Sequence, residues 1–537
     1  MKILLPIFLC LFSFTLSAQE LVIDWNLFLG CDSSQTEIYN TIPTRDKGLL
    51  FVGVTYCNGD GDISINAADT LGGSNVLVGK LDSNGSLAWI KLFVGSNFNY
   101  GKDACQNQDG SYGVLVYSEA SNGDFAENYG ISPSSDIWIL KLDSLGNKDW
   151  AKHFGSPYSD EPLSIKSTSD NGYILLGASN GSGDDIPVHY GDEFSFDWFV
   201  IKTDSLGIKQ WSKDIGTSSD EFEGGSILSV NNGYYLISST NGLSANCNDT
   251  NWHKGVYTDD DVYIIRLDSV GTELWDSSFG GTGNDEATDA FWDSEDSSIM
   301  VIGYTNSNDY FVTDLHGNYD IWVLKLSESG ALRWQKTLGD IDDDKGSGIV
   351  KTKDHDYVVY GSMNPFPMPI TIGVGQQDAW LFLIDSLGNE LSSKLFGGVR
   401  DEESNAVIPY KNGYAIGGFT GSSSFTEGLN IYGDWSSESG YISYIDYWPL
   451  AIPEVSNNIQ ELSLFPNPAT DEIRVIFPSN SGRVMINNVE GATLYTKTIT
   501  GNVKYIDLTI ANWIPGMYII KWIGEDGFTS VRKFLKQ

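Results

Sequence analysis

The residues of this chain whose types and spacing could do chemistry are acidic side chains set among glycines in one polar stretch. Asn58, Asp60, Asp62 and Asp69 lie in the segment NGDGDISINAAD. A hard cation such as calcium takes several carboxylate and carbonyl oxygens on a tight bend, although the glycine positions and the missing distal glutamate do not fit an EF-hand loop. Asp, Asn and Gly also dominate ordinary turns through hydrogen bonds from side chain to backbone. A plain turn is therefore favoured, with calcium kept as the candidate cofactor.

A second acidic pattern recurs along the chain and indicates an architectural task. A catalytic carboxylate pair is expected once, whereas these pairs open one strand in several repeats, so bonds to backbone amides are the favoured role. The pairs are Asp160/Glu161, Asp220/Glu221, Asp285/Glu286 and Asp401/Glu402. The histidines show no H-E-x-x-H or other metal-ligand spacing, and neither a G-x-S-x-G elbow nor a phosphate loop is present. The sequence thus predicts no catalytic residue.

An eleven-residue sequence motif recurs through most of the chain. It reads DIWILKLDSLG at 136, related copies begin at 75, 197, 261, 320 and 378, and a shortened copy begins at 439. Each full copy is an apolar β-rich run closed by a turn in which glycine can take positive φ. A tryptophan-marked strand follows, and a glycine-aromatic strand and the strand opened by the acidic pair precede. Four short antiparallel strands per unit of about 60 residues are typical of a propeller blade.

The two ends of the repeat region complement each other. The segment VIDWNLFLG at 22 is an isolated tryptophan strand, whereas the last unit, 401–446, stops after its third strand. If the first completes the second, seven blades close into a ring with no unpaired terminal edge. A β-helix or a string of separate sandwiches needs no such complementary ends. The predicted fold is therefore all-β: a seven-bladed β-propeller over 19–446, closed by the N-terminal strand.

The repeat carries a family resemblance. The pattern D-x-W-x-x-K-L-D-S-x-G, followed by W-x-K-x-F-G-G and D-E, is best preserved from Asp136 to Glu161. It resembles the propeller-like repeats of exported Bacteroidetes proteins, and the resemblance covers the repeat region. It says little about a ligand.

The last 77 residues, 461–537, have different character and follow a linker at 447–460. Alternating strands separated by Gly, Asn and Pro turns predict a small antiparallel β-sandwich. LSLFPNPATDEI at 462, IPGMYIIKW at 514 and VRKFLKQ at 531 resemble the C-terminal type A sorting domain of the type IX secretion system. The resemblance implies the secretion machinery as a partner and importance for export of one turn, one strand and the basic tail. The residues are Phe465, Pro466, Asn467 and Pro468, then Gly516, Met517 and Tyr518, then Arg532, Lys533 and Lys536.

The N-terminus and the charge indicate an exported protein. Lys2, the apolar run from Ile3 to Leu16 and the small residue Ala18 are typical of a signal peptide over 1–18, and no later stretch has the length of a transmembrane helix. The chain has 32 Lys plus Arg against 71 Asp plus Glu, a net charge of -39. Such a surface repels phosphate backbones and acidic lipids, which excludes a nucleic-acid binder. We expect a secreted or outer cell-surface protein.

Four cysteines remain after the signal peptide: Cys31, Cys57, Cys105 and Cys247. They allow three connectivities, and an exported protein can keep disulfides. If strands alternate in direction, the ends of the N-terminal strand and of the second strand of the first blade open on one face. This placement favours a Cys31–Cys57 disulfide.

Aromatic residues are the remaining ligand candidates. The repeated Trp138, Trp198, Trp322 and Trp380 could stack on sugar rings, but their fixed place in alternating strands favours packing between blades. Aromatics in long loops are better candidates because no blade geometry demands them. These are Tyr190, Phe194, Phe196, Trp252, Tyr257 and Tyr310.

The leading functional prediction is a non-enzymatic binding protein. Its carbohydrate or protein ligand would meet the face built from the second-to-third and fourth-to-first strand loops, because function on such folds lies in the loops. One alternative is a hydrolase or lyase acting on polysaccharide, with acidic residues near the central channel; near-uniform blades argue against it. A second alternative is a structural surface or adhesin component.

Overall fold

The computed structural model describes residues 21–30, 35–57, 73–126, 134–190, 195–216, 224–240, 259–341, 343–364, 378–396, 402–411, 413–420, 439–447, 463–465, 472–477, 481–488, 493–500, 505–524 and 529–536. The chain divides into two compact units, Met1–Pro449 and Leu450–Gln537. Every regular element in the described residues is a β-strand. The prediction of an all-β chain is therefore confirmed.

Six sheets of the first unit follow the chain in order, each with four antiparallel strands. The first two are β2 (Thr36–Pro43), β3 (Leu49–Thr55), β4 (Asn75–Leu81) and β5 (Leu87–Phe93), then β6 (Asn99–Gln106), β7 (Tyr112–Ser118), β8 (Asp136–Leu142) and β9 (Lys148–Phe154). The next two are β10 (Asp160–Ser167), β11 (Tyr173–Ser179), β12 (Asp197–Thr203) and β13 (Lys209–Ile215), then β14 (Ser226–Val230), β15 (Gly233–Thr240), β16 (Asp261–Leu267) and β17 (Glu273–Phe279). The last two are β18 (Asp285–Asp293), β19 (Ser298–Thr305), β20 (Asp320–Ser327) and β21 (Leu332–Leu338), then β22 (Asp343–Lys351), β23 (Tyr357–Asn364), β24 (Asp378–Ile384) and β25 (Glu390–Phe396).

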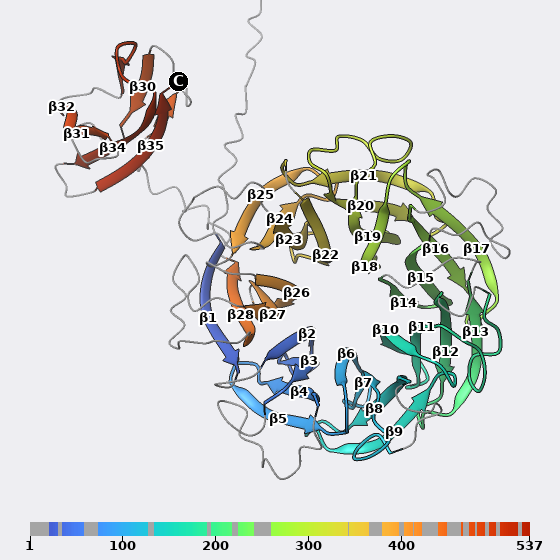
Figure 1. The fold of residues 1–537 in the computed structure, drawn as a ribbon. Coiled ribbons are helices and arrows are strands. Elements are labelled where there is room, and N and C mark those ends of the chain that lie inside the picture. Colours follow the sequence, from blue (N-terminus) through green and yellow to red (C-terminus); the bar gives the residue numbers. More distant parts are fainter. Residues whose placement is uncertain are drawn as a thin grey trace, which may run out of the picture. The chain divides into compact units, whose positions relative to one another are not determined.

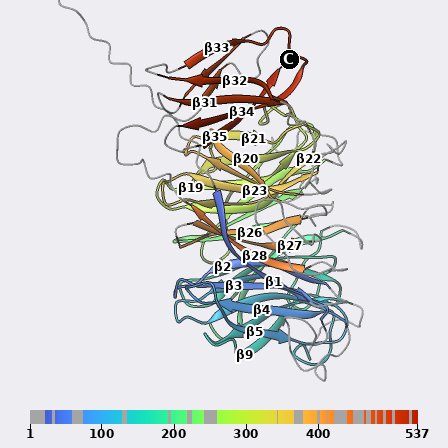
Figure 2. The same cartoon turned by 90° about the vertical axis from the view of Figure 1, so that its left-hand side faces the viewer.

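A further four-stranded sheet joins the two ends of the first unit. Its strand order is β1 (Leu21–Leu29), β28 (Ser439–Tyr447), β27 (Gly413–Thr420) and β26 (Glu402–Tyr410). β1 runs antiparallel to β28, with Trp25 opposite Tyr444 and Phe28 opposite Tyr441. Figure 2, which faces this sheet, shows β1 lying along β28. The N-terminal strand thus supplies the strand that the last repeat lacks.

The sheets surround a central opening. Figure 1 shows β2, β6, β10, β14, β18, β22 and β26 nearest to this opening, with the later strands of each sheet farther out. The middle strands are buried along their whole length, as β3, β4 and β12 illustrate. One apolar cluster, for example, joins Val52 and Val78 of one sheet to Val114 and Leu140 of the next. Each sheet covers its apolar faces with its neighbours, as expected of repeats that cannot bury both faces alone.

The tryptophan and the turn glycine of the repeat meet between consecutive sheets. Trp89 of β5 lies over Gly146 in the β8–β9 turn, and Trp150 of β9 lies over Gly207 in the β12–β13 turn. A Cβ added at Gly207, which has a φ of +74°, would be 2.7 Å from the Trp150 ring. Only glycine therefore fits both the left-handed backbone and the indole. The same contact joins Trp211 to Gly271, Trp275 to Gly330 and Trp334 to Gly388.

This contact predicts a stability difference between two glycine variants. Gly110 also sits in a turn with positive φ, +88°, but nothing lies within 4 Å of the site of its Cβ. Gly207→Ala and Gly110→Ala share the backbone strain, whereas only Gly207→Ala must displace a tryptophan ring. We expect Gly207→Ala to lose about 1–3 kcal/mol more unfolding free energy, the usual cost of overpacking. Calorimetry of both purified variants measures the difference, and equal losses would refute the proposed role of the contact.

The lysine and the first turn aspartate of the repeat also have structural partners. Lys202 is 4% exposed, and its ammonium donates to Asp170 at 2.9 Å and to the Thr203 carbonyl at 2.6 Å. Asp204 then closes the following turn by accepting the amides of Leu206 and Ile208, both at 2.9 Å. A buried ammonium is stable when it is paired and hydrogen-bonded in this way. The recurring motif therefore encodes the sheets and their turns.

The second unit is a small sandwich of two antiparallel sheets. One has the order β29 (Ser463–Phe465), β30 (Glu472–Ile476) and β33 (Tyr505–Thr509), and the other β32 (Thr493–Ile499), β31 (Gly482–Asn488), β34 (Gly516–Gly524) and β35 (Thr529–Lys536). Ile473, Val484, Ile486, Ile520 and Trp522 are among the buried residues of its core. The predicted β-sandwich thus agrees with the described strands.

Candidate functional site

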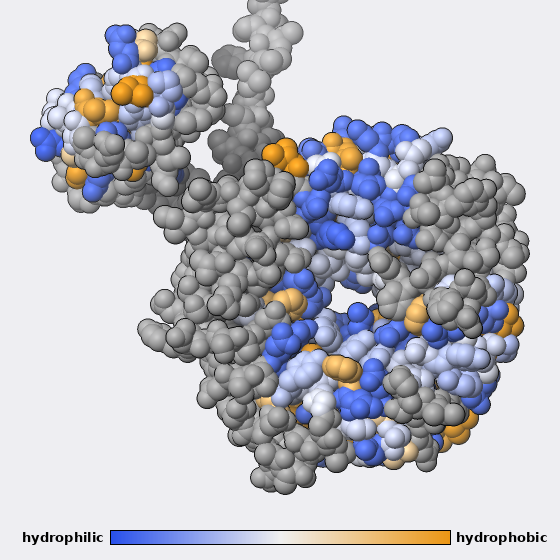
Figure 3. Space-filling view, viewed as in Figure 1, coloured by the Kyte–Doolittle hydropathy of each residue, from blue (hydrophilic) through white to orange (hydrophobic). Residues whose placement is uncertain are grey.

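A cavity of about 390 Å³ lies among the inner strands of the first unit. Its walls are mainly polar and come from all seven sheets of the first unit. The described residues around the opening are also largely hydrophilic on the face shown in Figure 3. The lining residues are Tyr39, Asn40, Lys102, Asp103, Leu163, Ser164, Lys166, Gly225, Ser226, Thr288, Asp289, Tyr304, Lys345, Gly346, Ser347, Tyr360, Ser362, Glu403, Ser404 and Asn405.

A β-bulge in the inner strand brings an extra residue to this wall. In β6, Gly101 and Asp103 pair with the consecutive residues Val116 and Leu115, so Lys102 has no partner in the ladder. The same shift occurs in five other inner strands, and a bulge re-aims the side chain it adds. Every unpaired residue lines the cavity: Tyr39, Lys102, Leu163, Thr288, Ser347 and Asn405. These positions are equivalent, yet each holds a different residue.

A glycine of the neighbouring strand makes room for the bulge. A Cβ on Gly303 of β19 would lie 1.6 Å from the Glu286 carbonyl oxygen, and one on Gly53 of β3 would lie 1.9 Å from that of Glu37. The backbone of the bulged strand therefore approaches too closely for any other residue. This requirement explains the glycine in the glycine-aromatic strand of the repeat.

Asp103 is the centre of a polar network in one wall. Its carboxylate accepts Asn40 Nδ2 at 2.6 Å, Ser164 Oγ at 3.0 Å and Lys166 Nζ at 3.1 Å. It also accepts the backbone amides of Ala104 at 2.7 Å and Ile165 at 2.8 Å. These donors come from three adjacent sheets, so the network holds the inner strands together while it shapes the cavity.

Asp289 and Lys166 are oppositely charged residues that line the cavity and attract each other. Burial raises the pKa of Asp289 to about 6, despite the attraction of Lys166 and a hydrogen bond from Ser226 Oγ. Burial opposes the charge of Lys166, but the carboxylates of Asp103 and Asp289 outweigh it and raise the pKa of the ammonium. The cavity therefore holds carboxylates and ammonium groups together.

Three tyrosines form a row beside the cavity. The Tyr39 ring meets the Tyr100 ring edge-on at 5.5 Å, and Tyr100 stacks on Tyr117 at 4.7 Å. Tyr100 donates its hydroxyl to Glu161 at 3.1 Å. Burial raises the pKa of Glu161 to about 7, although Tyr100 and Lys102 oppose the rise. Such rings offer apolar faces next to hydrogen-bonding groups.

Sequence reasoning missed this wall because it searched for residues that repeat or stand in long loops. Tyr39, Lys102 and Asp289 do neither. The signal that could have found Tyr39 and Lys102 is the position three residues after the start of the first strand of the sheet, where the residue type changes from sheet to sheet. Asp289 stands one position later, next to the bulge residue Thr288. In the sheets of β2 and β18 a glycine of the next strand, Gly53 or Gly303, marks the bulge, whereas β7 has Val116 at the same place.

The predicted loop aromatics do not form one site in the described residues. Tyr310 is 66% exposed, whereas Phe196 packs against an apolar cluster and Tyr190 is half-buried. Tyr190 and Phe196 precede β12, and Tyr310 precedes β20, so they belong to different sheets. Phe194, Trp252 and Tyr257 lie outside the described residues. These ligand residues stay predictions.

The repeated tryptophans and acidic pairs have structural surroundings. Trp138, Trp198 and Trp322 are at most 3% exposed, which leaves no ring face for a sugar. Asp160 Oδ2 accepts the Ser156 amide at 2.7 Å, and Asp285 Oδ2 accepts the Gly281 amide at 2.6 Å. Both amides belong to the connection between one sheet and the next, which agrees with an architectural role.

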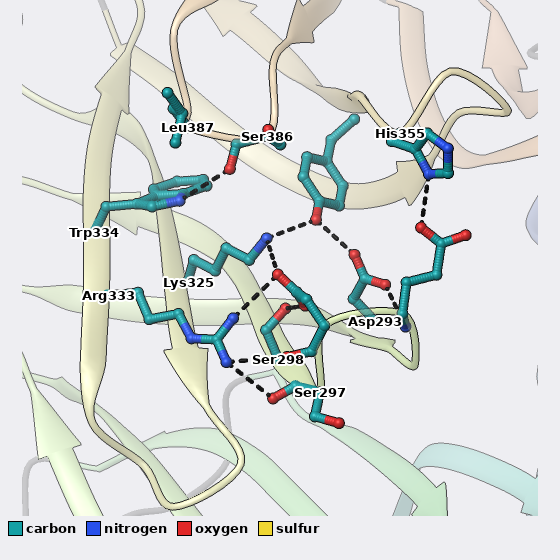
Figure 4. Close-up of polar contacts among 12 residues, drawn as sticks. Asp293, Ser297, Ser298, Lys325, Arg333, Trp334, His355, Ser386 and Leu387 are labelled. Carbon is teal, nitrogen blue, oxygen red and sulfur yellow. Dashed lines mark hydrogen bonds and ion pairs between the residues drawn. The ribbon is translucent and has the colours of Figure 1, made fainter.

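A second polar cluster joins two sheets (Figure 4). Tyr357 Oη donates to Asp293 at 2.7 Å and accepts Lys325 Nζ at 2.9 Å. Lys325 and Arg333 both bind Asp296, at 2.8 Å and 3.0 Å. Because these cations are matched by carboxylates and repeat the Lys202–Asp170 arrangement, we assign this cluster to stability.

The metal and cysteine predictions fall largely outside the described residues. Asn58, Asp60, Asp62 and Asp69 lie there, so calcium stays a prediction. Among the residues that are described, no group of three or more His, Cys, Asp or Glu is arranged to hold a metal. Cys57 is disulfide-bonded and Cys105 is free and buried. Cys31 and Cys247 are not among the described residues, so the Cys31–Cys57 pairing stays a prediction.

The described sorting residues lie in three strands of the sandwich, β29, β34 and β35. Phe465 ends β29, and Pro466, Asn467 and Pro468 lie outside the described residues. Gly516, Met517 and Tyr518 open β34, whose ladder pairs them with Lys536, Leu535 and Phe534 of β35. Tyr518 is 5% exposed and donates its hydroxyl to the Ile514 carbonyl at 2.6 Å. Arg532 is exposed and Lys533 pairs with Ile519, so the basic tail is a paired strand.

Comparisons with solved structures and with other known proteins return proteins of low similarity to this chain. A DUF4221 family member from Bacteroides vulgatus is 10% identical with a TM-score of 0.37, covering 80% of this chain and 99% of its own. The WD40 domain of Neurospora crassa Pan2 is 11% identical with a TM-score of 0.36, covering 78% and 95%. An uncharacterized WD repeat-containing protein of Acanthamoeba polyphaga mimivirus is 20% identical over 326 residues, 53% of this chain and 23% of the viral protein. None of these likenesses bears on ligand or activity.

The C-terminal unit has a more specific match. Residues 463–537 match the family model of the secretion system C-terminal sorting domain. Within the described ranges, no helix has the length and apolar character of a membrane span. The domain implies contact with the secretion machinery and export to the cell surface or the medium. Residues 463–537 are therefore a type IX secretion C-terminal sorting domain, and the protein is a cargo of that system.

Proposed function

We propose that this protein is a non-enzymatic binding protein, exported through residues 461–537 after removal of a signal peptide at 1–18. In this proposal residues 19–446 form a seven-bladed propeller closed by β1, and residues 447–460 link it to the sorting domain. The pairing of β1 with β28 supports the closure. The mature protein is then a rigid ring displayed at the surface or released.

The observation that carries the binding role is the variation at the bulges. Motif residues recur from sheet to sheet, whereas Tyr39, Lys102, Thr288 and their equivalents differ although they occupy the same position in the ladder. Architecture alone does not require a different residue in each sheet. A ligand that is asymmetric does, because each wall then meets a different part of it.

The composition of the cavity suits a carbohydrate. Sugar rings present apolar faces and many hydroxyl groups, which an aromatic ring and hydrogen-bonding side chains complement. Tyr39 supplies the aromatic ring. The hydrogen-bond donors and acceptors are supplied by Asn40, Ser164, Ser226 and Asp289. A volume of about 390 Å³ has room for a small saccharide unit.

A polysaccharide hydrolase or lyase is the second candidate, favoured by one observation. The raised pKa values of Asp289, about 6, and Glu161, about 7, are typical of carboxyl groups that exchange protons near neutral pH. Burial accounts for both shifts without catalysis. A structural surface or adhesin component would need neither binding nor turnover.

A glycan array with the purified protein, with and without calcium, separates these functions. We expect saturable binding to a saccharide class, with no shortened product in the supernatant. Binding should weaken about tenfold in Tyr39→Ala, which removes a stacking face, and not in Tyr310→Ala. Product release would favour the enzyme, and absence of both binding and turnover would favour the structural role.

A further inference from the structure

Lys102 is the wall residue of the cavity whose charge no described group contacts. Three ammonium groups line the cavity: Lys102, Lys166 and Lys345. Lys166 binds Asp103 at 3.1 Å, and Lys345 lies 4.2 Å from the ring centroid of Tyr304. No hydrogen bond, ion pair or ring contact joins Lys102 to another residue of the described chain. The bulge of β6 thus holds an uncommitted cation in the wall.

The surroundings of Lys102 do not balance its charge. The ammonium is open to the water of the cavity but lies deep among the inner strands, and this burial lowers its pKa, more than Asp103 and Glu161 raise it. The Asp103 carboxylate already accepts five hydrogen bonds, one of them from Lys166. Glu161 has a pKa of about 7 and therefore carries only part of a charge at neutral pH. An anion brought by a ligand would supply the missing partner.

We infer that the cavity binds a saccharide unit that carries a carboxylate, and that Lys102 recognises this carboxylate. The inference rests on the proposed function, because it needs a saccharide in the cavity. A charge-assisted hydrogen bond between carboxylate and ammonium is stronger inside such walls than in open water. The hydroxyl groups of the same unit would meet Asn40 and Ser226, and its apolar face would meet Tyr39.

A single negative charge fits the cavity better than a phosphate or sulfate cluster. Asp289 and Glu403 line the same space, so each additional negative charge on the ligand meets further repulsion. The whole chain also carries a net charge of -39, which repels polyanions at longer range. One carboxylate beside one lysine keeps the favourable contact with the smallest repulsion.

The test compares oligosaccharides that carry a single uronic acid with their methyl esters, which keep the sugar and remove the charge. With the full purified chain, calorimetry should give about tenfold tighter binding of the acid that matches the cavity than of its ester. Lys102→Met should abolish this preference and leave ester binding unchanged, and Lys102→Arg should keep most of it. Lys345→Met is the matched control, because it removes an ammonium already held over Tyr304. The acid-to-ester ratio should survive in that variant.

The outcomes separate this inference from the function on which it rests. Equal binding of acid and ester by the wild type, or an unchanged ratio in Lys102→Met, overturns the role of Lys102 and leaves carbohydrate binding standing. Loss of ester binding in Lys102→Met, with an unchanged melting temperature, overturns the specificity argument in favour of general wall damage. Failure of every saccharide to bind overturns both proposals.

Discussion

Removal of residues 461–537 is expected to leave the first unit folded and to stop the protein from leaving the cell. The sorting domain is a separate compact unit with its own apolar core. Its loss therefore removes the export signal and leaves the first unit intact. Fractionation followed by immunodetection should find the truncated protein in the periplasm, protease-resistant, and absent from the surface and the medium. Normal amounts outside the cell would contradict the assignment.

Two adjacent residues of β34 test whether the folded sandwich itself is the signal. Ile520 is fully buried in the core, whereas Lys521 is exposed on the same strand. Ile520→Asp places a charge where no partner exists, which costs several kcal/mol, so the sandwich should unfold and export should fail. Lys521→Asp should be exported as the wild type is. Fusion of residues 447–537 to a signal-peptide-bearing reporter should give export of the reporter.

Deletion of residues 21–30 is expected to destabilise the first unit more than any of the single substitutions proposed here. It removes β1 and leaves β28 as an open edge, which invites pairing with other chains. It also removes Leu29, which is 1% exposed and belongs to a cluster with Ile38, Phe51 and Leu77. We expect a lower denaturation midpoint, binding of a hydrophobic dye and oligomers on size exclusion. A synthetic peptide of residues 19–32 should restore part of the stability by pairing with β28.

Leu29→Ala gives a graded version of this experiment. Truncation of a buried leucine costs about 2–5 kcal/mol, so the variant should unfold well before the wild type. Leu27 is only half-buried on the same strand, and Leu27→Ala should cost clearly less. A deletion variant with the wild-type midpoint would show that β1 does not stabilise the ring.

The sequence predicted the sheets well because the residues that build them recur. The tryptophan, the lysine, the aspartates and the turn glycine each make the same contact in several sheets, as the contacts of Trp150 and Lys202 illustrate. A contact that repeats leaves a periodic trace that a single sequence displays. The N-terminal strand was also predictable, because an incomplete last repeat needs a partner.

The candidate site was not predictable, because its residues do not recur from sheet to sheet. Its bulge residues share a place in the ladder but not a chemical type, so no period marks Tyr39, Lys102 or Thr288. Their convergence depends on a one-residue shift in the register and on the arrangement of the sheets around the central opening, which brings residues far apart in the sequence to one cavity. The search for ligand aromatics in long loops therefore looked outside the cavity wall.

The bulges have a consequence for how this scaffold can change. Each added residue stands outside the backbone ladder, and the pairing resumes immediately after it. Substitution there alters the lumen and leaves the tryptophan–glycine contacts between sheets in place. Thr288 and Asn405 are exceptions, because each also donates to a carbonyl of the next sheet, that of Gly346 or Ile38. Mutagenesis libraries confined to these positions should yield mostly folded variants with altered ligand recognition. The fold can therefore acquire new ligand specificities with little loss of stability.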